Sequence, residues 1–220
     1  MSITQNLLNI KSTLPSTVTL VAVSKTKPIS DLMEAYNAGQ RIFGENKIQE
    51  MAEKWEAMPK DIEWHMIGHV QTNKVKFMAP FVSLIHGVDS LKLLEEINKQ
   101  AQKNNRIIDC LLQIYISEEE SKFGLDQEEL LEILSSKSFL EMKNIRIIGL
   151  MGMATFTDNH NQIKKEFTHL KSIFDYLASQ PKTQNLEPKT LSMGMSGDYQ
   201  LAIASGSTMV RIGSSIFGGR

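Results

Sequence analysis

The sequence predicts an α/β fold, a single (β/α)8 or TIM barrel with parallel strands. Short apolar runs that have the composition of buried strands alternate with longer segments that have helical spacing. This alternation is typical of parallel strands joined by right-handed crossovers. Eight such units fit into the 220 residues, near the lower size limit of a barrel. Two weak strands keep a doubly wound open sheet as the structural alternative.

The expected strands are apolar and rich in β-branched residues. The first, 17–24 (TVTLVAVS), has the composition of a parallel strand that is buried on both faces. The run 107–116 is the clearest strand, whereas 41–43 and 190–192 are short and weak. The other strands are expected at 64–67, 81–86, 144–151 and 208–212.

Each of the first seven strands is followed by a segment with helical spacing. The segment 28–38 has Ser30 or Asp31 near its start and Gly39 just past its end, which are typical helix boundaries. A longer amphipathic helix carries Ile163 and Phe167 on one face. Residues 2–11 allow an extra helix before the first strand, and the chain has room for only a short final one. The remaining helices are expected at 46–58, 72–79, 90–101, 127–134 and 199–204.

We expect one domain, residues 1–220, because the sequence contains no linker, low-complexity tract or internal repeat. The polar loop 180–188 lies inside the alternation of strands and helices.

The charge balance of the sequence makes one class of function, nucleic-acid binding, improbable. The formal net charge of −1 argues against nucleic acid as a partner, because proteins that neutralise phosphate backbones usually carry a large basic excess.

The sequence also indicates a compartment. No apolar stretch approaches the roughly 20 residues that span a bilayer, so no membrane association is expected. The N-terminal residues lack the pattern of a signal peptide. The single cysteine, Cys110, fits a reducing compartment and is expected to be buried rather than reactive. We therefore expect a cytoplasmic protein.

Polar side chains follow the expected strands at their C-terminal ends, where barrel enzymes build their active sites. Lys25 ends the first strand and, by period-two alternation, shares a face with Val21 and Val23. If that face points into the barrel, burial favours the neutral amine, which is the nucleophile that condenses with an aldehyde. The alternative, a solvated ammonium at the start of a loop, remains open.

The loops after the seventh and eighth strands often bind phosphate in barrels. Ser196 is expected to cap the helix that begins near Asp198, where backbone N–H groups are available to an anion. Gly213 allows the backbone to approach a ligand closely, and Ser214 adds a hydroxyl donor. Ordinary glycine and serine turns are the alternative interpretation of both loops.

Arg211 interrupts the apolar run 209–212. An arginine remains charged, so it needs a partner when buried. Either a ligand or a structural ion pair could supply that partner.

No metal site is expected. His65 and His69 are four residues apart, but they lie on a strand and its loop, not on a helix, and no second pair completes a ligand set.

Several segments together resemble the pyridoxal-phosphate homeostasis protein family, whose members are similar to the barrel domain of alanine racemase standing alone. The resemblance runs from about residue 19 to residue 218, with its motifs in the same order. The matching segments are VAVSKTKP at 21–28, FGENKIQE at 43–50, WHMIGHVQTNK at 64–74, SKFG at 121–124, GLMGMA at 149–154, LSMGMSGD at 191–198 and GSTMVRIGSSIFG at 206–218.

The resemblance implies that Lys25 carries pyridoxal 5′-phosphate (PLP) as an internal aldimine. It also implies that Ser196, Gly213 and Ser214 hold the phosphate and that Arg211 faces the pyridine nitrogen. Asn46 falls in the family's Gly-Glu-Asn segment, which is expected close to the cofactor. The resemblance does not indicate what Lys122, His69 and Tyr199 do.

Two functions need these residues: a PLP-binding protein that maintains or delivers the cofactor with little or no turnover, and a PLP-dependent amino-acid racemase. Racemisation needs a second acid/base group opposite the lysine. The resembling racemases take a tyrosine from an additional domain, and we expect no such domain here. We therefore favour a homeostasis protein without a catalytic residue, acting as a monomer, with PLP-dependent apo-enzymes as candidate recipients.

Overall fold

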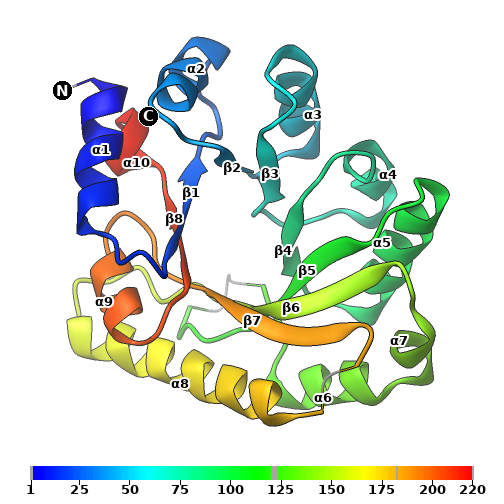
Figure 1. Cartoon of the computed structure of the whole chain (residues 1–220). Coiled ribbons are helices and arrows are strands. Elements are labelled where there is room, and N and C mark those ends of the chain that lie inside the picture. The colour runs from blue at the N-terminus through cyan, green and yellow to red at the C-terminus, as the bar shows by residue number, and fades with distance from the viewer. Residues whose placement is uncertain (1, 120–122, 182, 220) are drawn as a thin grey trace.

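Eight parallel strands form one closed barrel, in the order in which they occur along the chain (Figure 1). The computed structural model describes residues 2–119, 123–181 and 183–219. The last strand pairs with the first, with Thr19 opposite Met209. The predicted barrel is confirmed and the open sheet is excluded. The strands are β1 (Thr19–Val23), β2 (Ile42–Glu45), β3 (Glu63–Met66), β4 (Leu84–Val88), β5 (Ile108–Gln113), β6 (Ile145–Met151), β7 (Leu186–Ser192) and β8 (Met209–Ile212).

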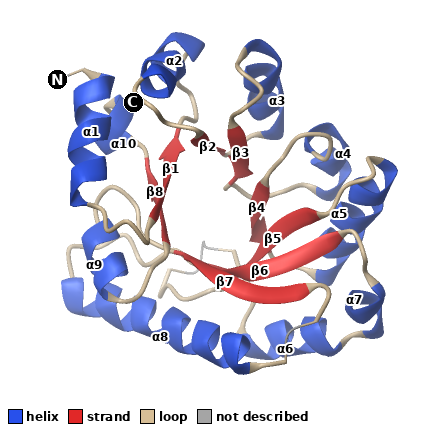
Figure 2. Cartoon of the chain, in the orientation of Figure 1, coloured by secondary structure: helices blue, strands red, loops and turns tan. Residues whose placement is uncertain are grey.

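The helices surround the barrel (Figure 2). The extra helix before β1 is present, and the backbone N–H of Thr4 in its first turn donates to the Glu34 carboxylate of the next helix at 2.9 Å. The sequence does not predict the short helix at residues 137–141. The helices are α1 (Ile3–Thr13), α2 (Ile29–Asn37), α3 (Ile48–Ala57), α4 (Val75–Met78), α5 (Leu91–Lys103), α6 (Gln127–Ser135), α7 (Lys137–Glu141), α8 (His160–Ser179), α9 (Tyr199–Ala204) and α10 (Ser214–Phe217), with a 3-10 turn (Thr72–Lys74) before α4.

Two strands, β4 and β7, start three or more residues away from their expected positions. β4 starts later than residue 81, because the backbone N–H of Phe81 donates to the carbonyl of Met78 at 3.1 Å and so still closes the end of α4. The Phe81 ring stacks on Trp55 with ring centroids 4.5 Å apart. β7 is longer than expected and includes Pro188. Proline is rare inside strands, so its presence argued against a strand at this position.

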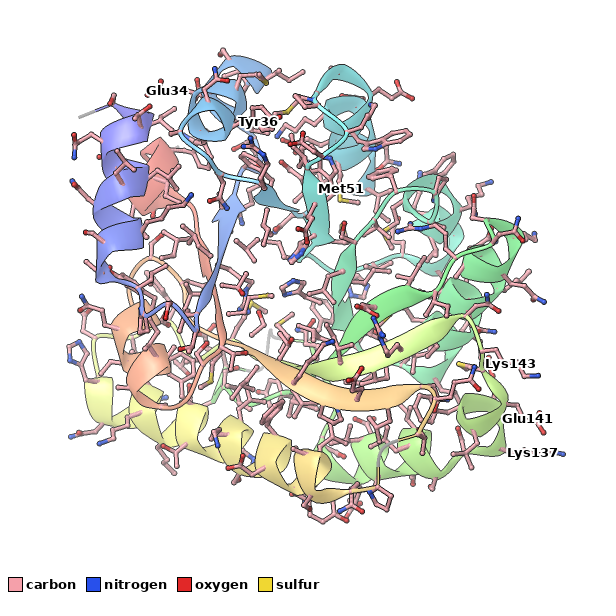
Figure 3. The ribbon with its side chains drawn as sticks, viewed as in Figure 1. Glu34, Tyr36, Met51, Lys137, Glu141 and Lys143 are labelled. Atoms are coloured by element: carbon pink, nitrogen blue, oxygen red, sulfur yellow. The ribbon has the colours of Figure 1, made fainter. Side chains whose placement is uncertain are left out.

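Apolar side chains pack in two layers. Alternate strand residues such as Val21, Leu111 and Met209 fill the inside of the barrel. The intervening residues pack outward against the helices, and Met51 of α3 is fully buried in this outer layer (Figure 3). Charged residues of α7, including the pair Lys137 and Glu141, lie on the outer surface (Figure 3). The alternation predicted for β1 is therefore confirmed at Val21, which points inward.

β6 and β7 approach each other very closely at Gly149. The register shifts between Ile147 and Gly149, where the φ angle of the glycine is +152°. A Cβ atom built there would lie 1.7 Å from the carbonyl oxygen of Thr190. The barrel wall therefore requires glycine at this position.

Within the part of the chain that the structure describes, no helix is long and apolar enough to cross a membrane. The described residues also contain no group of three or more histidine, cysteine or acidic side chains that could hold a metal ion. Cys110 is buried, as expected, and burial raises the pKa of its thiol.

Candidate functional site

A cavity of about 640 Å³ opens at the C-terminal ends of the strands. Val23 of β1 lines it, which places the inward face of that strand at the cavity wall. Segments that follow β1, β2, β3, β6, β7 and β8 contribute most of the remaining lining, together with Ile163 of α8 and Arg211 of β8. All six candidate residues line this one cavity: Lys25, Asn46, Ser196, Arg211, Gly213 and Ser214.

The loop that carries Lys25 is held on both sides of the lysine. On one side, the backbone N–H of Ser24 donates to the carbonyl of Gly44 at 3.0 Å. On the other, Thr26 has a left-handed φ of 64°, and its N–H donates to the Glu50 carboxylate at 2.6 Å. A left-handed conformation is uncommon outside glycine, so the surrounding contacts must hold it. Lys25 is therefore fixed in the cavity wall by its neighbours.

A buried ion pair supports the same loop from behind. The Lys54 ammonium of α3 donates to the Glu45 carboxylate at 2.8 Å, to Glu50 at 2.7 Å and to the carbonyl of Ser24 at 2.8 Å. The Ser24 hydroxyl also donates to Glu45 at 2.6 Å. Burial raises the pKa of the Glu45 carboxyl, and the bonds from Lys54 and Ser24 oppose that rise. Sequence reasoning missed this pair, although Glu45 is the acidic residue of the Gly-Glu-Asn segment.

Asn46 is positioned by close backbone packing. A Cβ atom built on Gly68 would lie 2.6 Å from the carbonyl oxygen of Asn46 and 2.8 Å from its Cα. A Cβ built on Gly87 would lie 2.7 Å from the carbonyl oxygen of Gly68. The ends of β2, β3 and β4 therefore approach one another at two glycines, and this contact sets where Asn46 meets the cavity.

We expect a Gly68→Ala variant to lose about 2 kcal/mol of unfolding free energy, because the new methyl group must displace the backbone of Asn46. Urea unfolding followed by circular dichroism measures this loss. Gly197→Ala is the control: it also lies in the cavity wall, but a Cβ there meets nothing within 4 Å. Equal stability of the two variants would contradict the proposed packing role of Gly68.

The expected capping role of Ser196 is wrong. Asp198 occupies the N-cap position of α9, after a turn that separates Ser196 from the helix. The Asp198 carboxylate accepts the backbone N–H of Met195 at 2.6 Å. The Ser196 hydroxyl faces the other loop, where it accepts the N–H groups of Gly213 at 3.3 Å and Ser215 at 3.5 Å. The two loops expected to bind phosphate are therefore joined by this hydroxyl.

Arg211 lies at the base of the cavity, with only 4% of its surface exposed. Its guanidinium donates to the carbonyl and hydroxyl of Ser192, at 2.9 and 2.7 Å, and to the carbonyl of Gly152 at 3.1 Å. Burial lowers the pKa of Arg211 to about 10, and the negative charge of Asp198 opposes this shift. The side chain is thus a cation at neutral pH that neutral acceptors hold in place. These bonds engage three of its five N–H donors.

Three further residues were named from the sequence, and two of them, His69 and Tyr199, lie outside the cavity lining. Lys122 falls outside the described residues. His69 is half-exposed, 3.2 Å from the Asp89 carboxylate, and stacks on Phe123. The Tyr199 hydroxyl lies 3.2 Å from that of Thr13.

Two buried histidines lie next to the site, and the sequence predicts a place in the site for neither of them. His86 of β4 lies 3.1 Å from the Ser192 hydroxyl, between that group and His65. A histidine inside an apolar strand run, at 81–86, was the available signal for His86. His65 was considered only as a metal ligand.

Comparison with known proteins shows which family this chain resembles. Residues 1–220 match the family model described as alanine racemase, N-terminal domain. The pyridoxal phosphate homeostasis protein of Aquifex aeolicus is 40% identical over 202 residues, covering 91% of this chain and 86% of its own length. That of Haemophilus influenzae is 41% identical over 208 residues, covering 93% and 86%.

The chain belongs to the pyridoxal phosphate homeostasis protein family. The suspected resemblance is thereby confirmed. PipY of Synechococcus elongatus has been solved with PLP bound; that structure has a TM-score of 0.88 to this chain at 33% identity, over 99% of this chain and 100% of PipY. The structure of PipY without PLP has a TM-score of 0.91 at 34% identity, with the same coverage. The likeness to this family therefore extends over the entire barrel.

Proposed function

We propose that this protein binds PLP through a covalent bond to Lys25 and serves PLP homeostasis or delivery, with little or no amino-acid turnover. The observation that carries the proposal is the meeting of all six candidate residues in one cavity. Its family membership supports the same function.

The residues present fit the cofactor at both of its ends. Ser196, Gly213 and Ser214 would hold the phosphate, where the Ser196 hydroxyl and the first turn of α10 meet. The Arg211 guanidinium would face the ring nitrogen, and Asn46 would contact the cofactor from the β2 loop. Bound PLP supplies an aldehyde for the lysine and an electron-withdrawing ring.

Arg211 also argues against efficient carbanion chemistry. Its positive charge disfavours protonation of a neighbouring ring nitrogen, because two cations repel each other. An unprotonated ring withdraws electrons less strongly.

A racemase needs a second acid/base group, and the tyrosines do not supply it. Tyr36 bonds to Asp61, Tyr115 donates to the carbonyl of Glu119, and Tyr199 contacts Thr13. Tyr176 is exposed on α8. None of the chain's four tyrosines lines the described cavity.

We expect purified protein incubated with PLP to show an absorbance band near the visible, and Lys25→Ala to lose it completely, because the amine forms the covalent bond. Borohydride reduction followed by mass spectrometry should place the added mass on Lys25. Lys47→Ala is the matched control, since that exposed lysine lies beside the same loop. A wild-type protein without the band would overturn the proposal.

Incubation with L-alanine and other L-amino acids, assayed for the D-enantiomer, tests the racemase alternative. Efficient racemisation that depends on Lys25 would overturn the absence of turnover. Slow or undetectable conversion by a fully loaded protein is the expected result.

The proposal extends to partners and organisation. We propose one domain over residues 1–220 that acts as a cytoplasmic monomer, with PLP-dependent apo-enzymes as recipients and no role for nucleic acid. The buried single cysteine fits a reducing compartment. Light scattering on the loaded protein tests the monomer, and recovery of activity in a PLP-dependent apo-enzyme mixed with it tests delivery.

A further inference from the structure

A chain of polar groups crosses the apolar interior of the barrel beneath the cavity. His65 of β3 and His86 of β4 face each other, with Nδ1 of His65 3.0 Å from Nε2 of His86. Nδ1 of His86 lies 3.1 Å from the Ser192 hydroxyl of β7, and that hydroxyl lies 2.7 Å from the Arg211 guanidinium of β8. All four side chains are at most 4% exposed.

One arrangement of protons satisfies each contact in this series of polar groups. A guanidinium donates and never accepts, so the Ser192 oxygen accepts from Arg211 with one of its two lone pairs, and Nδ1 of His86 is the acceptor within reach of the Ser192 proton. With that proton donated to His86, Nδ1 of His86 is unprotonated, and the proton of this ring resides on Nε2. That proton is donated to Nδ1 of His65, whose remaining proton lies on its Nε2. Each imidazole is therefore neutral and has a single tautomer.

The electrostatics of the interior favour the same assignment. Burial lowers the pKa of His65 to about 3. Burial lowers the pKa of His86 well below its usual value, and the neighbouring His65 and Arg211 lower it further. A charged imidazole could not accept from its neighbour, and it would stand near the Arg211 cation in the buried interior.

We infer that Ser192 and His86 are positioning residues: they fix the guanidinium of Arg211 at the base of the cofactor cavity. His65 in turn holds His86 in place. This inference rests on the proposed function, because it assigns the orientation of the group that would face the ring nitrogen. Apolar side chains would fill this part of the barrel interior equally well. Four hydrogen-bonded polar side chains that end at Arg211 therefore indicate a role beyond packing. The acceptors that hold Arg211 bear no negative charge, so they do not neutralise its positive charge toward the ligand.

The first test uses the protein without cofactor. Nitrogen-15 NMR of histidine side chains at pH 7 should show both His65 and His86 as neutral Nε2–H tautomers, assigned by loss of one signal in each of His65→Gln and His86→Asn. Ser192→Ala should leave the fold intact and move the His86 signal, because its acceptor nitrogen loses its donor. A protonated ring or an Nδ1–H tautomer at either position would overturn the inference.

The second test uses PLP titration. Ser192→Ala and His86→Leu are expected to weaken PLP binding by about tenfold and to shift the absorbance maximum of the bound cofactor, since a loosened guanidinium no longer presents one orientation. His86→Asn, which keeps an acceptor near the Ser192 hydroxyl, should recover more affinity than His86→Leu. His69→Ala is the control. This exposed histidine pairs with Asp89 and takes no part in the hydrogen bonds that link His65, His86, Ser192 and Arg211.

The outcomes separate the inference from the proposed function. If the wild type shows no PLP linked to Lys25, the proposed function fails, whatever the tautomers. If the wild type is loaded and folded Ser192→Ala and His86→Leu keep both its affinity and its absorbance maximum, the positioning role fails while the proposed function stands.

Discussion

A Gly149→Ala variant is expected to lose about 4 kcal/mol of unfolding free energy, enough to deplete the folded protein. The methyl group would lie 1.7 Å from the carbonyl oxygen of Thr190, and the φ of +152° is one that residues with a side chain rarely adopt. The obstacle is the backbone of the adjoining strand, so no rotamer change relieves it. Urea unfolding of the purified variant, or its yield in the soluble fraction, measures the loss.

Two further glycines calibrate this result. A Cβ on Gly152 would meet the tip of the Leu170 side chain at 2.7 Å, and a flexible tip can move aside, so Gly152→Ala should cost far less. A Cβ on Gly219 meets nothing within 4 Å, so Gly219→Ala should match the wild type. A Gly149→Ala protein as stable as these two would show that β6 and β7 can separate at this point without harm.

The second large effect is expected at Lys54. Lys54→Met removes the cation that binds the buried Glu45 carboxylate and should cost about 3 kcal/mol at pH 7, because a buried charge would be left without its partner. Urea unfolding measures the change. Lys47→Met is the control, since Lys47 is exposed at the start of the same helix.

The pH dependence distinguishes this explanation from a simple packing defect. Burial already holds the pKa of Glu45 above its ordinary value, and loss of Lys54 removes a bond that opposes the rise. A carboxyl whose folded pKa is raised costs least stability below its ordinary pKa and most once the pH exceeds the folded value. The deficit of Lys54→Met should therefore shrink between pH 7 and pH 5, as a proton neutralises Glu45. An equal deficit at both pH values would contradict the electrostatic account, and Glu45→Gln combined with Lys54→Met should recover part of the loss at pH 7.

The barrel could be predicted from the sequence because its signal is repeated. Parallel strands that are buried on both faces read as apolar runs, and each helix between them has its own period. The strand boundaries that were predicted wrongly depend on tertiary contacts. Phe81 continues an apolar run, yet its backbone closes α4, and Pro188 lies in a strand that its residue type argues against.

The six candidate residues could be predicted to meet in one cavity because motif and barrel geometry point to the same strand ends. The contacts that hold these residues in place could not be predicted, because such contacts depend on which distant side chains meet in the fold. Lys54 lies on an outer helix and reaches Glu45 and Glu50 only once α3 packs on the barrel. Ser196 shows the same limit: its spacing suggests a helix cap, whereas its hydroxyl turns to the loop after β8.

The pairing of β1 with β8 joins strands from opposite ends of the sequence, with Val21 opposite Arg211. Contacts between such distant segments are slow to form, because the entropy of closing the long intervening loop opposes them. Until then β1 has an unpaired edge, which is prone to association with other chains. The cavity spans this same seam: Lys25 follows β1 and Gly213 follows β8. A ligand held by both residues binds only the closed barrel, so its concentration would shift the balance between closed and partly folded chains by mass action. Supply of the ligand would in this way also raise the fraction of chains whose barrel is closed.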